Sequence, residues 1–168
     1  QSESIHKNTG QELYIVAAYY DEVLVGAIPC YIKHHSYGEY LFDWQWANHF
    51  QMNKIPYYPK LVAYSPFTPI IGPKFLTSKN ESKIKRKIYD ALLNEFVSFA
   101  TQENCFSASI LFPTPAEAEY LANQTIARIE KRVNYQYNWK NHGYENFNSF
   151  MMDLRKNKRK NIKKERQS

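Results

Sequence analysis

The stretch ELYIVAAYYDEVLVGAIPCYIKHH, residues 12–35, decides the fold class of this 168-residue chain. Two segments rich in Val, Ile and Tyr alternate between apolar and polar positions, and the pair Asp21–Glu22 separates them. This pattern predicts a β-hairpin, with one strand at Leu13–Tyr19 and a second from Val23 to about Lys33. We therefore expect an antiparallel sheet at the start of the domain.

The segments that follow the hairpin predict further strands and an ordered loop. Residues 56–73 contain five prolines in eighteen positions, which indicates a loop held by fixed backbone angles rather than a strand or helix. Within it, Lys60–Tyr64 fits one short strand. The other predicted strands are GEYLFDW (38–44), CFSASILF (105–112) and ARIEKRVNYQYNWKN (127–141).

Three helices are expected from apolar periodicity and capping residues. The clearest one follows residue 78, where Ile84, Ile88, Leu92 and Phe96 recur at helical spacing and Ser78 or Asn80 is the expected N-cap. A short helix should begin after Thr114 with Pro115 at its first position. The last helix should start near Asn146 and run on through the basic C-terminal stretch, and WQWANHF (44–50) predicts one or two helical turns. Three strands followed by alternating helices and strands predict the α/β class, with a mixed sheet flanked by helices.

The positive charge is concentrated in the last fourteen residues, RKNKRKNIKKERQS (155–168), which hold eight Lys or Arg and one Glu. Residues 1–154 then carry 14 basic and 15 acidic side chains, so the remainder of the chain is close to neutral. A nucleic-acid-binding module acting through this basic helix is one interpretation, since cations neutralise phosphates. A helix face exposed to solvent or to another domain is the alternative. The phosphate-binding candidates are Lys158, Arg159, Lys160, Lys163, Lys164 and Arg166.

The two cysteines, Cys30 and Cys105, lie 75 positions apart and outside any CxxC or Cys/His pattern, so no metal is expected. We interpret both as small buried hydrophobic residues. No apolar run approaches the ~18 residues of a membrane span, and no signal peptide is visible. The expected location is the cytoplasm.

Several segments resemble a known family in the same order along the chain. These are CYIKHHSYGEYLFDWQWA (30–47), YYPKL with PFTPIIGPK (57–74), and YNWKNHGYENFNSFMMDL with KRKNIKKER (137–166). They are similar to segments of bacterial FemAB-like proteins, labelled peptidoglycan biosynthesis proteins or GNAT-family N-acyltransferases. The resemblance covers nearly the whole chain.

The resemblance implies a GNAT-like fold with a central, mostly antiparallel sheet. It also implies two such domains in tandem, with residues 1–154 as most of the first and 155–168 as a helix leading into a missing second domain. A fragment truncated at both ends should be inactive by itself. The whole protein is expected to transfer an acyl or aminoacyl group from acyl-CoA or aminoacyl-tRNA to an amine, on a small molecule or a peptidoglycan precursor.

Acyl transfer to an amine benefits from a base and from groups that orient the acceptor. The candidates for catalysis are His34, His35, Glu39 and Asp43; ordinary hydrogen-bonding roles are the alternative. Trp44, Trp46, Tyr57 and Tyr58 are candidates for stacking a substrate, against a role in core packing. Lys60 and Thr68 complete the substrate-binding candidates.

The segment before the main helix, PFTPIIGPKFLTSKNESK (66–83), holds a single glycine, Gly72. It lacks the pattern R/Q-x-x-G-x-G/A with which coenzyme-A-dependent relatives hold pyrophosphate. This difference disfavours ordinary acetyl-CoA chemistry in this domain. A non-catalytic protein with a degenerate GNAT fold is a third interpretation.

Overall fold

A computed structural model describes residues 5–78 and 84–167 of the chain. The chain divides into two compact units, Gln1–Lys131 and Arg132–Ser168, and each is considered by itself. The prediction of a domain that ends at residue 154 stays a prediction.

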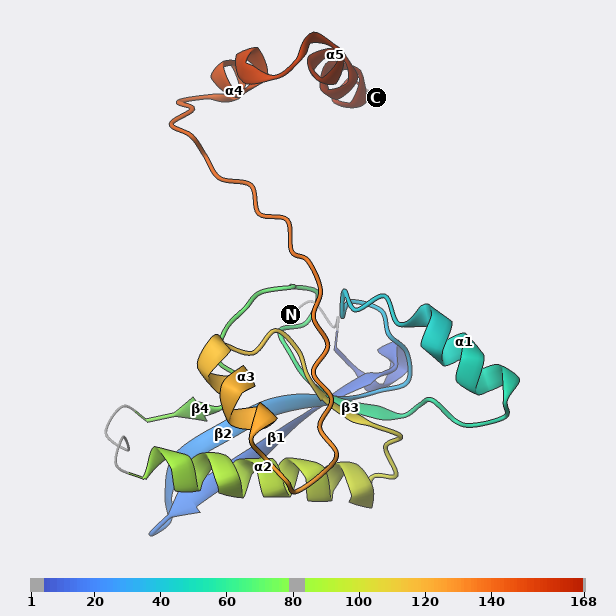
Figure 1. The fold of residues 1–168 in the computed structure, drawn as a ribbon, viewed down its shortest axis with the longest axis vertical. Helices are drawn as coiled ribbons and strands as arrows, with labels where there is room; N and C mark the ends of the chain where they lie inside the picture. The colour runs from blue at the N-terminus through green and yellow to red at the C-terminus, as the bar shows by residue number, and fades with distance from the viewer. Residues whose placement is uncertain (1–4, 79–83, 168) are drawn as a thin grey trace. The chain divides into compact units, whose positions relative to one another are not determined.

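The first unit is built on a five-stranded sheet (Figure 1). Its strands are β1 (Gln11–Tyr20), β2 (Val23–Lys33), β3 (Lys60–Ala63), β4 (Leu76–Thr77) and β5 (Ala108–Ile110). β1 and β2 form the predicted hairpin, and Asp21 and Glu22 in its turn both have positive φ. β2 pairs antiparallel with β1, β3 and β4, and β3 pairs parallel with β5. The predicted mixed, mostly antiparallel sheet is confirmed.

The described residues of this unit also form four helical segments. They are the short 3-10 helix η1 (Lys7–Thr9), α1 (Trp44–Met52), α2 (Lys85–Gln102) and α3 (Pro115–Ala122). α2 lies along one face of the sheet and contacts β1, β2 and β5 (Figure 1). It buries Ile88, Leu92 and Phe96, as the apolar periodicity predicted.

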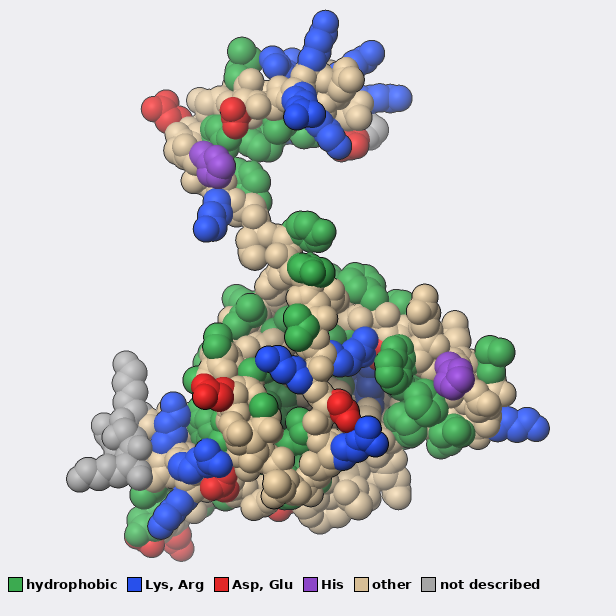
Figure 2. Space-filling view, in the orientation of Figure 1, with side chains coloured by type: hydrophobic (Ala, Val, Ile, Leu, Met, Phe, Trp, Pro, Cys, Tyr) green, Lys and Arg blue, Asp and Glu red, His purple; other side chains and the backbone are tan. Residues whose placement is uncertain are grey.

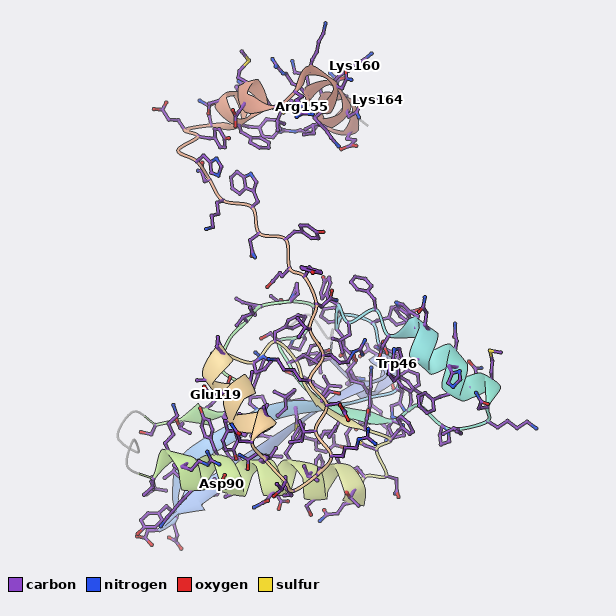
Figure 3. The ribbon with its side chains drawn as sticks, in the orientation of Figure 1. Trp46, Asp90, Glu119, Arg155, Lys160 and Lys164 are labelled. Atoms are coloured by element: carbon purple, nitrogen blue, oxygen red, sulfur yellow. The ribbon has the colours of Figure 1, made fainter. Side chains whose placement is uncertain are left out.

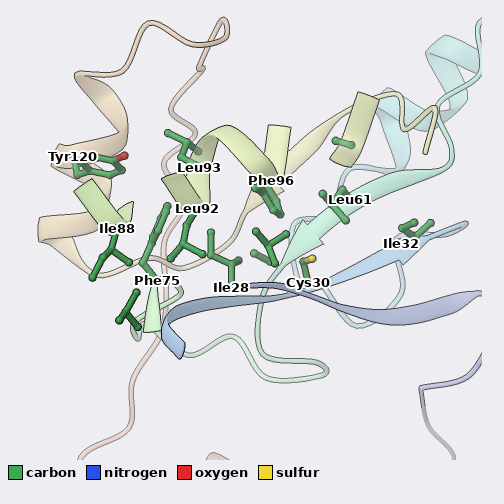
Figure 4. Packing of buried hydrophobic residues seen from close by; sticks show 14 residues of the cluster. Ile28, Cys30, Ile32, Leu61, Phe75, Ile88, Leu92, Leu93, Phe96 and Tyr120 are labelled. Carbon is green, nitrogen blue, oxygen red and sulfur yellow. The ribbon is translucent and has the colours of Figure 1, made fainter. Parts of the chain in front are cut away.

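Close packing of α2 on β2 forms the main core (Figure 4). The buried side chains include Ile28, Cys30, Leu61, Phe75 and Leu92. Gly26 permits this close approach, since a Cβ at its position would lie 2.5 Å from Ile88 Cγ2. Both cysteines are free thiols, and burial raises the pKa of Cys30 to about 11.

The structure confirms the start of α3 and corrects that of α2. Thr114 is the N-cap of α3 and Pro115 its first residue. α2 begins at Lys85 with Ile84 at the N-cap position, so Ser78 does not cap it. Asn80 lies outside the described residues.

Two predicted strands are wrong. Residues 38–43 follow an irregular path up to the start of α1. The segment 127–141 has no strand either; between Ala122 and Phe147 the chain forms no helix and no strand. Alternating polarity in 127–141 suits a strand only when a neighbouring strand supplies backbone partners, and within the described residues none pairs with it.

The second unit contains α4 (Phe147–Asp153) and α5 (Lys156–Glu165). Asn146 caps α4 through its side chain, so the predicted start of the last helix is confirmed. The predicted continuous helix is wrong, because Leu154 takes extended backbone angles, with φ −83° and ψ 147°, and separates α4 from α5. Trp139, Tyr144 and Phe150 form an aromatic cluster beside α4.

Candidate functional site

Buried polar side chains surround the ammonium group of Lys60, the first residue of β3. Its Nζ donates to Ser36 Oγ at 2.8 Å, to Glu39 Oε2 at 2.7 Å and to Asp43 Oδ2 at 2.8 Å. All four residues are buried. The ammonium therefore has an acceptor for each of its three protons.

A second buried lysine, Lys33, lies opposite Lys60 in the β2–β3 register. Its Nζ donates to the Tyr37 carbonyl oxygen at 2.7 Å and to the Tyr64 hydroxyl at 2.9 Å. It also lies 3.3 Å from Glu39 Oε1, so the Glu39 carboxylate bridges two ammonium groups. We call this group the Lys60 cluster; it comprises Lys33, Ser36, Glu39, Asp43, Tyr57, Tyr58, Lys60 and Tyr64.

The cluster balances two cations against two anions, and its titration behaviour follows from burial and pairing. Burial lowers the pKa of Lys33, and the Glu39 carboxylate only partly offsets this. For Asp43, burial alone would raise the pKa, but bonding to Lys60 together with the hydroxyls of Ser36 and Tyr57 holds it below the usual range. Burial raises the pKa of the Tyr64 hydroxyl, and the nearby Glu39 carboxylate raises this pKa further.

Tyrosine hydroxyls connect the cluster to its edge. Tyr57 donates to Asp43 Oδ2 at 2.9 Å, and the hydroxyls of Tyr58 and Ser36 lie 2.8 Å apart. Both tyrosines are half-buried, and Lys60 Nζ lies 5.5 Å and 5.6 Å from their ring centroids. Tyr58, Ser36 and Lys60 therefore form a hydrogen-bonded chain from a half-buried hydroxyl to the buried charges.

The irregular path of residues 36–43 creates this arrangement. Ser36, Glu39 and Asp43 point inward, whereas Tyr37, Tyr40 and Phe42 are exposed. Gly38, Tyr40 and Phe42 have positive φ values of 77°, 58° and 51°, which an ordinary strand does not contain. Hydrogen bonds to buried lysines thus outweigh the strand preference of these aromatic residues.

Five of the predicted site residues lie outside the cluster in the same unit. His34 is exposed, and His35 Nε2 lies 2.7 Å from the Thr9 carbonyl oxygen. Trp46 is exposed on α1 (Figure 3). Thr68 donates to the carbonyl oxygen of Pro66 within the proline-rich loop.

Trp44 is also outside the cluster, and its ring packs edge-on against Tyr37, with centroids 5.0 Å apart. The structure therefore brings together five predicted residues: Glu39, Asp43, Tyr57, Tyr58 and Lys60. Sequence reasoning missed Lys33, Ser36 and Tyr64. The available signal was a lysine in an otherwise apolar strand, since a buried lysine is rare unless it is paired.

The predicted phosphate-binding residues belong to α5 and the residue after it. Arg159 donates to the Leu154 carbonyl oxygen at 3.1 Å, and the Arg166 guanidinium lies 4.1 Å from the Phe147 ring centroid. These two arginines stabilise the second unit. The remaining four, Lys158, Lys160, Lys163 and Lys164, are exposed, and Figures 2 and 3 show the cations of α5 spreading outward from the helix.

In the described part of the segment between β3 and α2, three backbone amides of residues 72–75 are bound within the protein. The Gly72 amide donates to the Phe112 carbonyl oxygen at 3.1 Å. The amides of Lys74 and Phe75 both donate to Glu117 Oε1, at 2.7 Å and 2.8 Å, and Pro73 has none. The buried Glu117 carboxylate thus occupies the amides that would otherwise be free to hold a phosphate.

Sequence reasoning also missed Glu117, although the capping box Thr114-x-x-Glu117 was a usable signal. Glu117 Oε2 accepts from the Thr114 amide and hydroxyl at 2.9 Å and 2.8 Å. One carboxylate therefore both caps α3 and fixes the loop at Lys74.

Metal-binding clusters and membrane-spanning helices are both absent from residues 5–78 and 84–167. In that part of the chain, no three His, Cys, Asp or Glu side chains are grouped so that they could hold a metal ion. None of the helices described there has the length and apolar character needed to cross a membrane.

Comparison with known proteins identifies one family. The model of the FemAB-like family, described as peptidoglycan biosynthesis and recognition, matches residues 1–168. No curated protein and no solved structure matches the chain. Because the family model spans every residue, the chain belongs to the FemAB-like family of peptidoglycan biosynthesis and recognition.

Proposed function

We propose that the intact protein transfers an acyl or aminoacyl group to an amine of a peptidoglycan precursor in the cytoplasm, and that the first unit binds the acceptor. The observation that carries this proposal is the convergence of three side chains of the segment 36–43, those of Ser36, Glu39 and Asp43, on the buried Lys60 ammonium of β3. Burying four charges is costly unless each is paired and hydrogen-bonded. Such clusters are frequent where a protein must hold a reactive geometry fixed.

Within this function we assign Glu39 and Asp43 to positioning rather than to proton removal. Both carboxylates are buried and bonded to lysine ammonium groups, at 2.7 Å and 2.8 Å from Lys60. A base must lie within hydrogen-bond reach of the proton that it removes. The half-buried Tyr58 hydroxyl, fixed by Ser36, is the member of the cluster best placed to contact the acceptor amine.

For the acyl donor, the geometry favours aminoacyl-tRNA over acyl-CoA. The amides of Gly72, Lys74 and Phe75 donate to Phe112 and Glu117, so these three amides are not available to the pyrophosphate of coenzyme A. The exposed lysines of α5 provide cations for a phosphodiester backbone instead. The same lysines are the feature that supports nucleic-acid binding as the second candidate function.

A transfer assay with the intact protein tests the proposal. The acceptor is a soluble nucleotide-linked muramyl peptide, and the donors are radiolabelled aminoacyl-tRNA and acyl-CoA in separate reactions. We expect label in the acceptor from aminoacyl-tRNA, and a fall in kcat/KM of about 10²-fold for Tyr58→Phe. The matched control is Tyr20→Phe, because Tyr20 is exposed at the hairpin end. Absence of transfer from both donors would refute the proposal.

A further inference from the structure

Five exposed rings lie next to the Lys60 cluster, and three of them have unfavourable backbone angles. Tyr40, Phe42 and Phe67 have φ values of 58°, 51° and 56°. Bulky residues rarely adopt this left-handed conformation. The strain does not serve core packing, because Phe42 is 70% exposed and the other two are also exposed.

The rings come from two segments that meet at Gly38. A Cβ at Gly38 would lie 2.6 Å from Phe67 Cδ1, so the ring of Phe67 rests on the bare backbone of the glycine. The Tyr40 hydroxyl donates to the Phe67 carbonyl oxygen at 3.3 Å. In the same segment as Gly38, the Tyr37 ring packs against Trp44. We call Tyr37, Tyr40, Phe42, Trp44 and Phe67 the ring surface.

The Lys60 cluster holds this surface from inside the protein. Each exposed ring of residues 37–44 is one or two positions from a buried anchor, namely Ser36, Glu39 or Asp43. Lys33 Nζ also donates to the carbonyl oxygen of Tyr37. The rings therefore stand on a backbone that charged hydrogen bonds fix in place.

The charge of the surface restricts its ligand. The two lysines and two carboxylates beneath it cancel, and none of the five rings carries a charge. The five residues of the ring surface include no cation that could bind a phosphate or a carboxylate. An uncharged ligand with apolar C–H faces and hydroxyl groups suits exposed Tyr and Trp rings, which combine an apolar face with a polar edge.

We propose that the ring surface binds the amino-sugar face of a peptidoglycan glycan. This inference deepens the proposed function by naming the part of the acceptor that is recognised, and it rests on the family's link to peptidoglycan. In this role, the left-handed conformations of Tyr40, Phe42 and Phe67 present the three rings outward.

The test uses binding rather than transfer, so it can fail independently of the proposed function. The probe is chitotetraose, a neutral oligomer of N-acetylglucosamine, titrated into the chain and followed by tryptophan fluorescence and NMR. We expect saturable binding that weakens at least about tenfold in Phe42→Gly and in Tyr37→Ala, a loss equivalent to one good contact.

Phe42→Gly distinguishes a binding role from a structural one. Glycine accepts positive φ without strain, so the melting temperature should stay the same or rise while binding falls. The matched control is Lys54→Gly, since Lys54 is exposed and has φ 56° but lies outside the ring surface. Its melting temperature should behave like that of Phe42→Gly, and its binding should equal that of the wild type.

Three results would overturn the inference. One is the absence of chitotetraose binding at about 10 mM, a concentration at which even weak specific contacts are detectable. Another is equal binding by Phe42→Gly, Tyr37→Ala and the wild type. The third is binding of the muramyl peptide stem without any contribution from the sugar. If transfer activity persists in these cases, the proposed function stands and the ring surface has no part in it.

Discussion

Replacing Lys60 by methionine is the sharpest perturbation of the buried cluster. Methionine has nearly the same length but no charge, so Asp43 keeps only the hydroxyls of Tyr57 and Ser36, and Glu39 keeps only Lys33 as an ionic partner. Removing one partner of a buried ion pair costs about 3–5 kcal/mol, because the remaining charge stays desolvated. We expect the free energy of unfolding to fall by that amount.

Arg128→Met provides the matched control. The Arg128–Glu130 pair has the same 2.8 Å separation as Lys60–Asp43, but its side chains are 91% and 71% exposed, against 3% and 2%. A pair in solvent contributes about 0–1 kcal/mol. The two variants therefore separate the effect of burial from that of distance.

The measurement is urea unfolding followed by tryptophan fluorescence, with Trp44 and Trp46 as reporters close to the cluster. A second experiment at lower pH tests the cause. In the wild type, the depressed pKa of Asp43 adds stability that is present above the unfolded pKa and is lost as the pH falls through the folded value. Without Lys60, burial dominates and raises the pKa of Asp43, so acidification toward pH ~4 should reduce the difference between Lys60→Met and the wild type. Equal stabilities of Lys60→Met and Arg128→Met would refute this reasoning.

Three further predictions concern packing, the Glu117 carboxylate and the basic helix. Gly26→Ala should destabilise the protein by about 1–3 kcal/mol through overpacking, because the new Cβ would lie 2.5 Å from Ile88 Cγ2. The control is Gly72→Ala, whose Cβ meets nothing within 4 Å, so this variant should leave thermal unfolding nearly unchanged. Glu117→Ala leaves the buried amides of Lys74 and Phe75 without an acceptor and should lower the free energy of unfolding by at least about 2 kcal/mol. The control is Glu119→Ala, because Glu119 is exposed on the same helix (Figure 3), and its stability should change little. Similar losses of stability in both variants would contradict the role assigned to Glu117. Replacing Lys158, Lys160, Lys163 and Lys164 with alanine should weaken the salt dependence of single-stranded RNA binding, measured by fluorescence anisotropy. The slope of log binding constant against log salt concentration should become shallower by about 0.7 for each phosphate that is no longer neutralised. An unchanged slope would exclude α5 from phosphate binding.

The sequence patterns correctly predicted the elements whose signals lie within one short segment of the chain. The hairpin, α2 and α3 follow from alternating residues, helical periodicity and a capping box, all contained in one short stretch each. Residues 38–43 were mispredicted because their conformation depends on Lys33 and Lys60, which come from two other segments. Secondary-structure propensities of single residues carry no information about hydrogen bonds between residues far apart in the sequence.

The candidate site shows the same limit. Glu39, Asp43 and Lys60 could be singled out as polar residues among apolar neighbours, but their pairing with one another requires the β2–β3 register that places Lys33 opposite Lys60. The break at Leu154 was missed because the polar residues on either side of it are all compatible with a helix. The apolar stripe of Phe147, Phe150, Met151 and Leu154 ends at the break, and only Ile162 is apolar beyond it, but the end of a stripe does not show that the backbone turns there.

The most direct test of the central claim is the amine reactivity of each lysine in the native chain, measured by limited acetylation and mass spectrometry. The structure predicts that Lys33 and Lys60 stay unmodified under conditions in which Lys158 and Lys160 react fully. Modification of Lys60 in the wild type at the rate of the α5 lysines would contradict the buried cluster on which the account rests.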